Sequence, residues 1–204
     1  GLDLSSSRDL TAFVMVFPVG DEYHVLPQFF MPSDGIRDRA QEDKVPYDVW
    51  AKQGFITLID GPVIVPAVVA QHVAEASSDF DMQLMAYDRW RINDFTRELD
   101  AIGVQLPMQA FGQGYKDMAP AVDKLEQLVL GRKLRHGDNP VLNMCAANAI
   151  AERDPAGNRK LNKAKSVGRI DGLVALAMAL GVEAMGEGAA ASSPWDDPAF
   201  TFGD

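Results

Sequence analysis

A run of strand patterns, followed by alternating strand and helix patterns, constrains the fold of this chain most strongly. Apolar runs at 11–19 and 22–31 flank the turn signal Gly20-Asp21, and a short strand pattern at 1–5 precedes them. This arrangement predicts an opening antiparallel meander. Further strand patterns then alternate with helix patterns, the strands at 55–59, 83–88 and 104–112 and the helices at 66–78, 88–103 and 117–130. Because such alternation favours parallel pairing, we predict an α/β fold with a mixed sheet, the meander followed by parallel strands, flanked by helices.

The last third of the chain predicts three further features. A Pro-Ala-Gly turn between two extended arms predicts an added β-hairpin at 148–161. The almost wholly apolar segment 169–185 predicts a helix that is buried on most sides. Residues 186–204 contain acidic but no basic residues, so we expect a flexible acidic C-terminal tail after a domain at 1–185. The strand pattern directly after Gly1 suggests a piece of a longer chain.

Composition excludes several classes of protein. With 204 residues, 47% of them hydrophobic, the chain can bury one sizeable core. The single cysteine, Cys145, rules out a disulfide framework and a Cys-rich zinc site, and the three histidines lack paired ligand spacing. The longest apolar runs fall short of the roughly 18 residues that a membrane-spanning helix needs, so no membrane partner is expected.

Charge is unevenly distributed along the chain. The formal net charge is -10, yet the stretch 132–169 holds nine basic residues against three acidic ones. A basic stretch on an acidic body fits an anionic polymer that is held along one edge. A solvated charged loop explains the composition equally well.

Three aspartates stand in apolar surroundings. Asp3 lies between two leucines of the first strand, where an ionised carboxylate requires a cation or a cluster of donors. Asp88 ends an apolar strand and Asp171 opens the buried helix, although an Asp at either position also serves as a helix cap. If the three side chains converge above the sheet, their mutual repulsion requires a divalent metal among them.

Several ordered motifs resemble the nuclease domain of the large terminase subunit of tailed bacteriophages, which has the fold of RNase H and RuvC-type resolvases. The motifs cover nearly the whole chain before the tail. They are GLDLSSSRDLTA at 1–12, VPYDVWAKQG at 45–54, AYDRW at 86–90, FGQG at 111–114, HGDNPVL at 136–142 and RDPAGNRKLNKAKSVGRIDGLVALAMAL at 153–180.

The resemblance implies an activity and a site. It implies a metal-dependent DNA endonuclease that cuts concatemeric viral DNA during genome packaging, with Asp3, Asp88 and Asp171 as catalytic metal ligands. Asp9 is a candidate supplementary ligand, although an Asp in a turn is more often a local cap. Oxygen ligands favour Mg²⁺ or Mn²⁺, and two such ions suit phosphodiester hydrolysis.

The resemblance also implies partners. These are double-stranded DNA, the terminase ATPase domain, the small terminase subunit and the portal protein, in the cytoplasm of the infected host cell. This sequence has no GxxxxGK[ST] phosphate loop of the ATPase domain. Lys160, Lys163 and Lys165 follow the predicted hairpin, and we expect them to contact the DNA backbone. Two alternatives stay open, a RuvC-like Holliday-junction resolvase and a non-catalytic docking module of a packaging motor.

Overall fold

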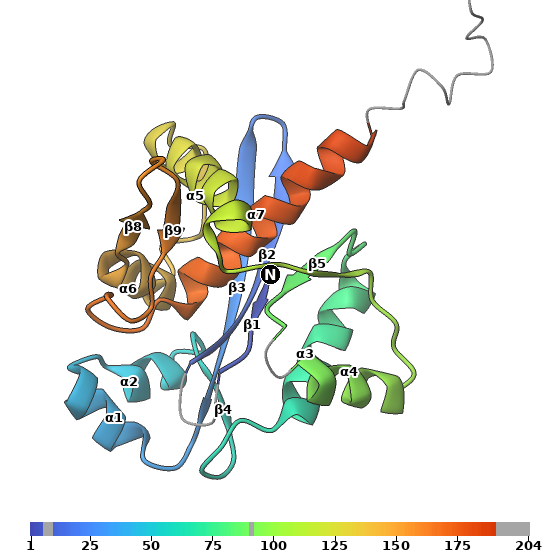
Figure 1. Ribbon diagram of the computed structural model, residues 1–204. Coiled ribbons are helices and arrows are strands. Elements are labelled where there is room, and N and C mark those ends of the chain that lie inside the picture. The colour runs from blue at the N-terminus through green and yellow to red at the C-terminus, as the bar shows by residue number, and fades with distance from the viewer. Residues whose placement is uncertain (6–9, 90–91, 191–204) are drawn as a thin grey trace, which may run out of the picture.

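The computed structural model describes residues 1–5, 10–89 and 92–190, with side chains up to residue 185. In this part of the chain a seven-stranded mixed sheet forms the centre of the structure (Figure 1). Its strands are β1 (Leu2–Asp3), β2 (Thr11–Val19), β3 (Glu22–Pro32), β4 (Thr57–Ile59), β5 (Met85–Tyr87), β6 (Met108–Ala110) and β7 (Leu134–Arg135). The spatial order is β4-β3-β2-β1-β5-β6, and β7 pairs with the other end of β3.

Pairing in the sheet follows the predicted division into a meander and parallel strands. β1, β2 and β3 are antiparallel neighbours, and Gly20, with a φ of 63°, allows the tight turn between β2 and β3. β4 lies parallel to β3, and β5 and β6 continue the sheet in parallel beyond β1. The predicted mixed α/β sheet is therefore confirmed.

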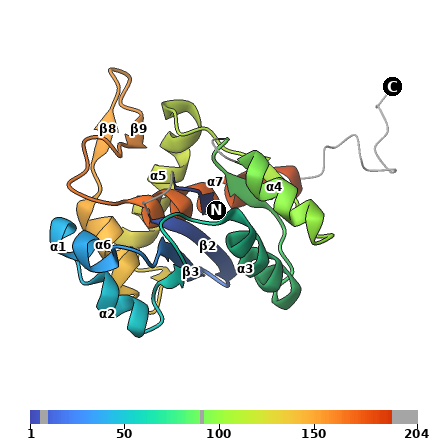
Figure 2. The same ribbon diagram turned by 90° about the horizontal axis from the view of Figure 1, so that it is seen from below.

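Helices cover both faces of the sheet. They are α1 (Ile36–Asp43), α2 (Tyr47–Lys52), α3 (Pro66–Asp79), α4 (Ile92–Ala101), α5 (Tyr115–Leu130), α6 (Pro140–Asn148) and α7 (Asp171–Ala190). Alternation along β2 divides the core, since Ala12 and Val14 pack with α5, α6 and α7 while Phe13 and Met15 pack with α3 and α4. Figures 1 and 2 show these two groups of helices on opposite sides of the sheet.

The added hairpin is present outside the main sheet. It consists of the antiparallel strands β8 (Ala151–Arg153) and β9 (Arg159–Leu161). Arg159 joins this hairpin to α5 through ion pairs with Asp123 and Glu126, at 2.5 and 2.8 Å. The hairpin therefore stands against α5, beside the start of α7 (Figure 1).

The stretch between β3 and β4 forms two short helices, α1 and α2, because the chain turns at Lys44, which has a φ of 55°, and Pro46 follows. Two local predictions need correction. The two-residue strand β7 was missed, since it carries too short a pattern to detect. α7 continues to Ala190, five residues past the predicted end of the domain, and residues 191–204 of the predicted tail lie outside the described part.

Within the described residues, none of the helices combines the length and the apolar character that a bilayer crossing requires.

Candidate functional site

Two of the three predicted aspartates lie at one edge of the sheet because their strands are neighbours. Leu2 of β1 pairs in parallel with Tyr87 of β5. Asp3 and Asp88 each follow one member of this pair, and parallel strands end at the same edge. Asp3 is almost completely buried, whereas Asp88 is partly exposed. The sheet therefore brings these two carboxylates to the same region.

The third aspartate reaches this region through the packing of α7. Asp171 is the first residue of α7, which crosses β1, β2 and β5 on one face of the sheet. The close approach depends on Gly172, because a Cβ at this position would lie 2.7 Å from the Phe29 ring and 3.2 Å from Cys145 Sγ. The glycine of the RIDG motif thus lets the acidic end of α7 pack tightly against the core.

We expect Gly172→Ala to reduce the free energy of unfolding by about 1–3 kcal/mol, since both neighbouring side chains are buried and must move. Chemical denaturation of the two proteins measures the difference. Gly114→Ala is the control, because a Cβ there meets no atom within 4 Å. Equal losses in both variants would contradict the packing role of Gly172.

Lys163 joins the first and third aspartates. Its Nζ lies 2.7 Å from Asp3 Oδ2 and 2.8 Å from Asp171 Oδ1. The Asp3 and Asp171 side chains are only 2% and 10% exposed, whereas that of Lys163 is 42% exposed. Asp3 Oδ2 makes no well-aligned hydrogen bond among the described residues. One ammonium group is therefore shared by two carboxylates that water scarcely reaches.

Burial and neighbouring charges shift the pKa values of Asp3 and Lys163. Burial raises the pKa of Asp3 to about 7, Lys163 opposes this shift, and the nearby charges of Asp171 and Asp88 add to it. Burial alone would lower the pKa of Lys163, but Asp3 and Asp171 outweigh burial and raise it above its ordinary value. The negative charges of Asp171 and Asp88 therefore both disfavour ionisation of Asp3.

Asp88 is oriented by a neighbouring loop. Gln113, from the FGQG segment between β6 and α5, donates a 2.7 Å hydrogen bond from Nε2 to Asp88 Oδ2. Among the described residues, no three Asp, Glu, His or Cys side chains converge closely enough to hold a metal in this arrangement. The donors nevertheless suit a hard cation, since they are carboxylate oxygens and two of them already share a positive charge. Asp9 lies outside the described residues.

A pocket of about 350 Å³ opens beside the carboxylates. Lys163, Arg169 and Asp171 contribute to its walls. Arg169 Nε lies 2.9 Å from Asp43 Oδ2 and donates to the Tyr47 hydroxyl at 3.1 Å. These contacts tie α1 and α2 to the segment that precedes Asp171. Sequence reasoning missed Asp43 and Tyr47, although Tyr47 belongs to one of the motifs that carry the resemblance.

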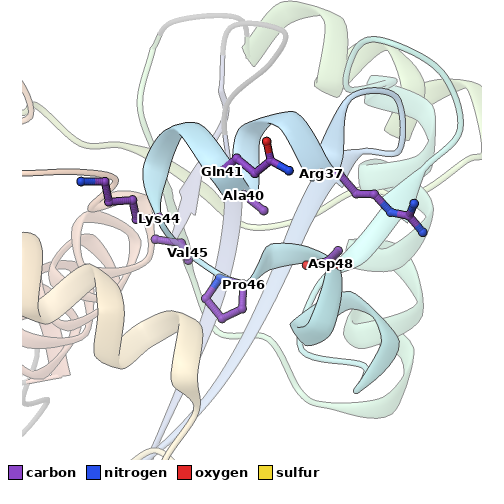
Figure 3. Close-up of a pocket in the computed structure, with 7 residues that line it drawn as sticks. All are labelled: Arg37, Ala40, Gln41, Lys44, Val45, Pro46 and Asp48. Atoms are coloured by element: carbon purple, nitrogen blue, oxygen red, sulfur yellow. The ribbon is translucent and has the colours of Figure 1, made fainter.

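A second pocket, of about 420 Å³, lies between α1 and α2 (Figure 3). Arg37, Lys44 and Asp48 are among the residues that line it, and none of the predicted catalytic aspartates does. Its position does not connect it with the carboxylates, so we assign it no part in the candidate site.

The other two predicted DNA-binding lysines lie near the hairpin. Lys160 Nζ lies 4.7 Å from the centre of the Tyr115 ring and 3.9 Å from Glu152, and Lys165 forms an ion pair with Glu152. The basic stretch is therefore partly neutralised by acidic residues. Lys163 differs from these two, because its ammonium is directed at the predicted catalytic carboxylates.

The mixed sheet, with carboxylates gathered at its edge and at the start of the packed helix α7, defines an RNase H-like fold. The family model described as "Terminase large subunit, endonuclease domain" matches residues 1–187. The chain belongs to this family.

Known proteins agree with this assignment. The terminase large subunit of Enterobacteria phage HK97 is 47% identical over 198 residues, which are 97% of this chain and 39% of that protein. The crystal structure of the HK97 bacteriophage large terminase matches with a TM-score of 0.85 and 48% identity, over 89% of this chain and 38% of that one. The chain thus spans about two fifths of the length of these relatives.

Two further matches have lower sequence identity to this chain. Protein YmfN of Escherichia coli (strain K12) is 23% identical over 78% of this chain and 36% of its own length. The large terminase nuclease from thermophilic phage G20c has a TM-score of 0.54 and 13% identity, over 88% of this chain and 78% of that chain, and supports the fold alone.

Proposed function

We propose that this chain is a metal-dependent DNA endonuclease. The observation that carries the proposal is the pair of buried carboxylates, Asp3 and Asp171, which share one cationic partner next to the edge of the sheet. Membership of the terminase endonuclease family supports the same activity. Metal-assisted phosphodiester hydrolysis needs ligands for divalent cations, and this buried acidic pair supplies carboxylate oxygens of that kind.

Asp3, Asp88 and Asp171 are the proposed metal ligands. Their oxygen donors favour Mg²⁺ or Mn²⁺, and we propose two ions. When bound, such ions activate a water for attack and stabilise the negative charge of the reacting phosphate. The chain's own part is to hold the acids in position, through β1, through the Gln113 contact to Asp88 and through the packing of α7.

The proposed biological role follows from the relatives. We propose that the domain cuts concatemeric viral DNA during genome packaging, in the cytoplasm of the infected host cell. The longer relatives contain further sequence beyond the part matched here. We therefore propose that the domain works with a terminase ATPase domain, the small terminase subunit and the portal protein.

We propose that DNA approaches along the β8–β9 hairpin and the loop that follows it. Lys160, Lys163 and Lys165 come from this segment, and the pocket beside the carboxylates is continuous with it through Lys163. The lysines contact phosphates, so they contribute affinity without sequence preference.

We expect the double variant Lys160→Gln/Lys165→Gln to bind duplex DNA more weakly and with a flatter salt dependence. Each lost phosphate contact lowers the slope of log affinity against log salt by about 0.9, which gives about 1.8 for the pair. Fluorescence anisotropy over a range of salt concentrations measures the slope. Arg97→Gln is the control, because Arg97 is an exposed residue of α4, which packs on the other face of the sheet. An unchanged slope would place DNA on another face.

One experiment separates the proposed function from its alternatives. Linear, supercoiled and branched DNA are incubated with the chain, with and without Mn²⁺. Metal-dependent cleavage of linear and supercoiled DNA supports the terminase nuclease. A strong preference for branched DNA indicates a RuvC-like resolvase, and the absence of cleavage on every substrate indicates a docking module.

A further inference from the structure

The loop after β9 sends one lysine into the acidic site. Lys163 stands two residues beyond Leu161, the end of β9, and its Nζ lies within 2.8 Å of both Asp3 and Asp171. Lys163 also lines the pocket of about 350 Å³, and its side chain is 42% exposed. The ammonium therefore has a short path to solvent.

The ammonium of Lys163 contacts the oxygens that a metal ion needs. Asp3 Oδ2 and Asp171 Oδ1, which form ion pairs with Nζ, belong to the proposed ligands. A divalent ion bound by both carboxylates would stand a few Å from the ammonium, and positive charges at that distance repel strongly where water is excluded. The ion and the ammonium cannot both occupy the space between these oxygens.

We propose that Lys163 is an internal counter-ion that exchanges with the divalent metal. In the metal-free protein its ammonium pairs with both Asp3 and Asp171 and so keeps the buried acids compatible with the fold. When the metal binds, the ammonium leaves the carboxylates and moves into the pocket. This inference rests on the proposed function, because it takes the metal ligands from there.

The exchange needs only a side-chain movement. The backbone around Lys163 is held by a 2.7 Å hydrogen bond from Ser166 Oγ to the Asn162 carbonyl and a 3.1 Å bond from Lys165 N to Asn162 Oδ1. Rotation about the four-carbon stem of Lys163 carries the ammonium from the carboxylates into the pocket while this loop stays in place. The affinity of the site for metal is thus reduced by the free energy needed to detach the ammonium.

Calorimetric titration with MnCl₂ and MgCl₂ alone, without DNA, tests the exchange. We expect Lys163→Met to bind either ion at least about tenfold more tightly than wild type, since the competing charge is gone. Its melting temperature without metal should be lower, because two buried acids lose their partner. Lys133→Met, which removes an exposed charge paired with Asp21, should match wild type in metal affinity.

The outcomes separate this inference from the proposed function. Equal or weaker metal binding by Lys163→Met overturns the exchange while leaving the metal site itself in place. If wild type and Lys163→Met both bind no metal, the proposed metal site fails and the exchange fails with it. Metal binding that appears only in Lys163→Met supports the exchange.

A second measurement uses the unaltered protein and so does not depend on the folding of a variant. The NMR signal of the Lys163 Cε methylene should shift on addition of Mg²⁺, as the ammonium leaves the carboxylates, whereas that of Lys133 should stay constant. A Lys163 signal that stays unchanged at metal saturation overturns the exchange.

Discussion

The Asp171→Asn protein is expected to lose DNA cleavage while it keeps its fold. The substitution removes one of the two buried carboxylates that share a cation, and Lys163 then pairs with Asp3 alone. Because metal ions contribute several kcal/mol of charge stabilisation to phosphodiester hydrolysis, we expect the rate to fall by at least about a hundredfold. Plasmid cleavage in Mn²⁺ measures the rate, and circular dichroism checks the fold.

Asp79→Asn is the matched control for this experiment. Asp79 is an exposed aspartate at the end of α3, which packs on the opposite face of the sheet from α7. Its replacement makes the same change of charge without touching the site, so cleavage should continue at the wild-type rate. Cleavage by Asp171→Asn at that same rate would show that the metal-site assignment is wrong.

Without metal, the contribution of Asp3 to the stability of the wild-type protein is expected to fall as the pH rises from about 4 to about 7. Burial raises the pKa of Asp3 from its ordinary value of 3.8 to about 7. The folded protein therefore holds a proton on Asp3 that the unfolded chain releases, and this advantage is lost as the pH passes through the folded-state pKa. Because one pKa unit is worth about 1.4 kcal/mol, the raised pKa of Asp3 corresponds to a few kcal/mol.

Comparison with Asp3→Asn isolates this effect from other titrating groups. The variant cannot ionise at this position, so its free energy of unfolding should exceed that of wild type by a margin that grows between pH 4 and pH 7. Urea denaturation at several pH values in the presence of a chelator gives both curves. Parallel curves would contradict a raised pKa of Asp3.

Much of the fold could be predicted because its signals are local and repeated. The apolar run of β2 is recognisable in the sequence as a strand, and its residues Ala12 and Phe13 face opposite sides of the sheet. The turn at Gly20 then indicates that β3 is its partner. The turn at Lys44 between α1 and α2 was not predicted, because a single turn carries no periodic pattern. Periodicity describes segments better than the turns between them.

The candidate site was only partly accessible to sequence reasoning. Asp3 was noticed because a charge between two leucines is unusual. The contact of Lys163 with Asp3 was not predicted, because the sequence does not distinguish this lysine from the others in the basic stretch. The contact of Arg169 with Asp43 joins residues 126 positions apart, a separation over which no local pattern carries information.

The position of the acids in the chain has a consequence for biosynthesis. Asp3 is among the first residues and Asp171 opens the last described helix, so nearly the whole domain must be synthesised before the two can meet. Contacts between residues far apart in the sequence form late, because a long loop has to close first. We therefore expect a nascent chain on the ribosome to carry no nuclease site until the segment that forms α7 has emerged.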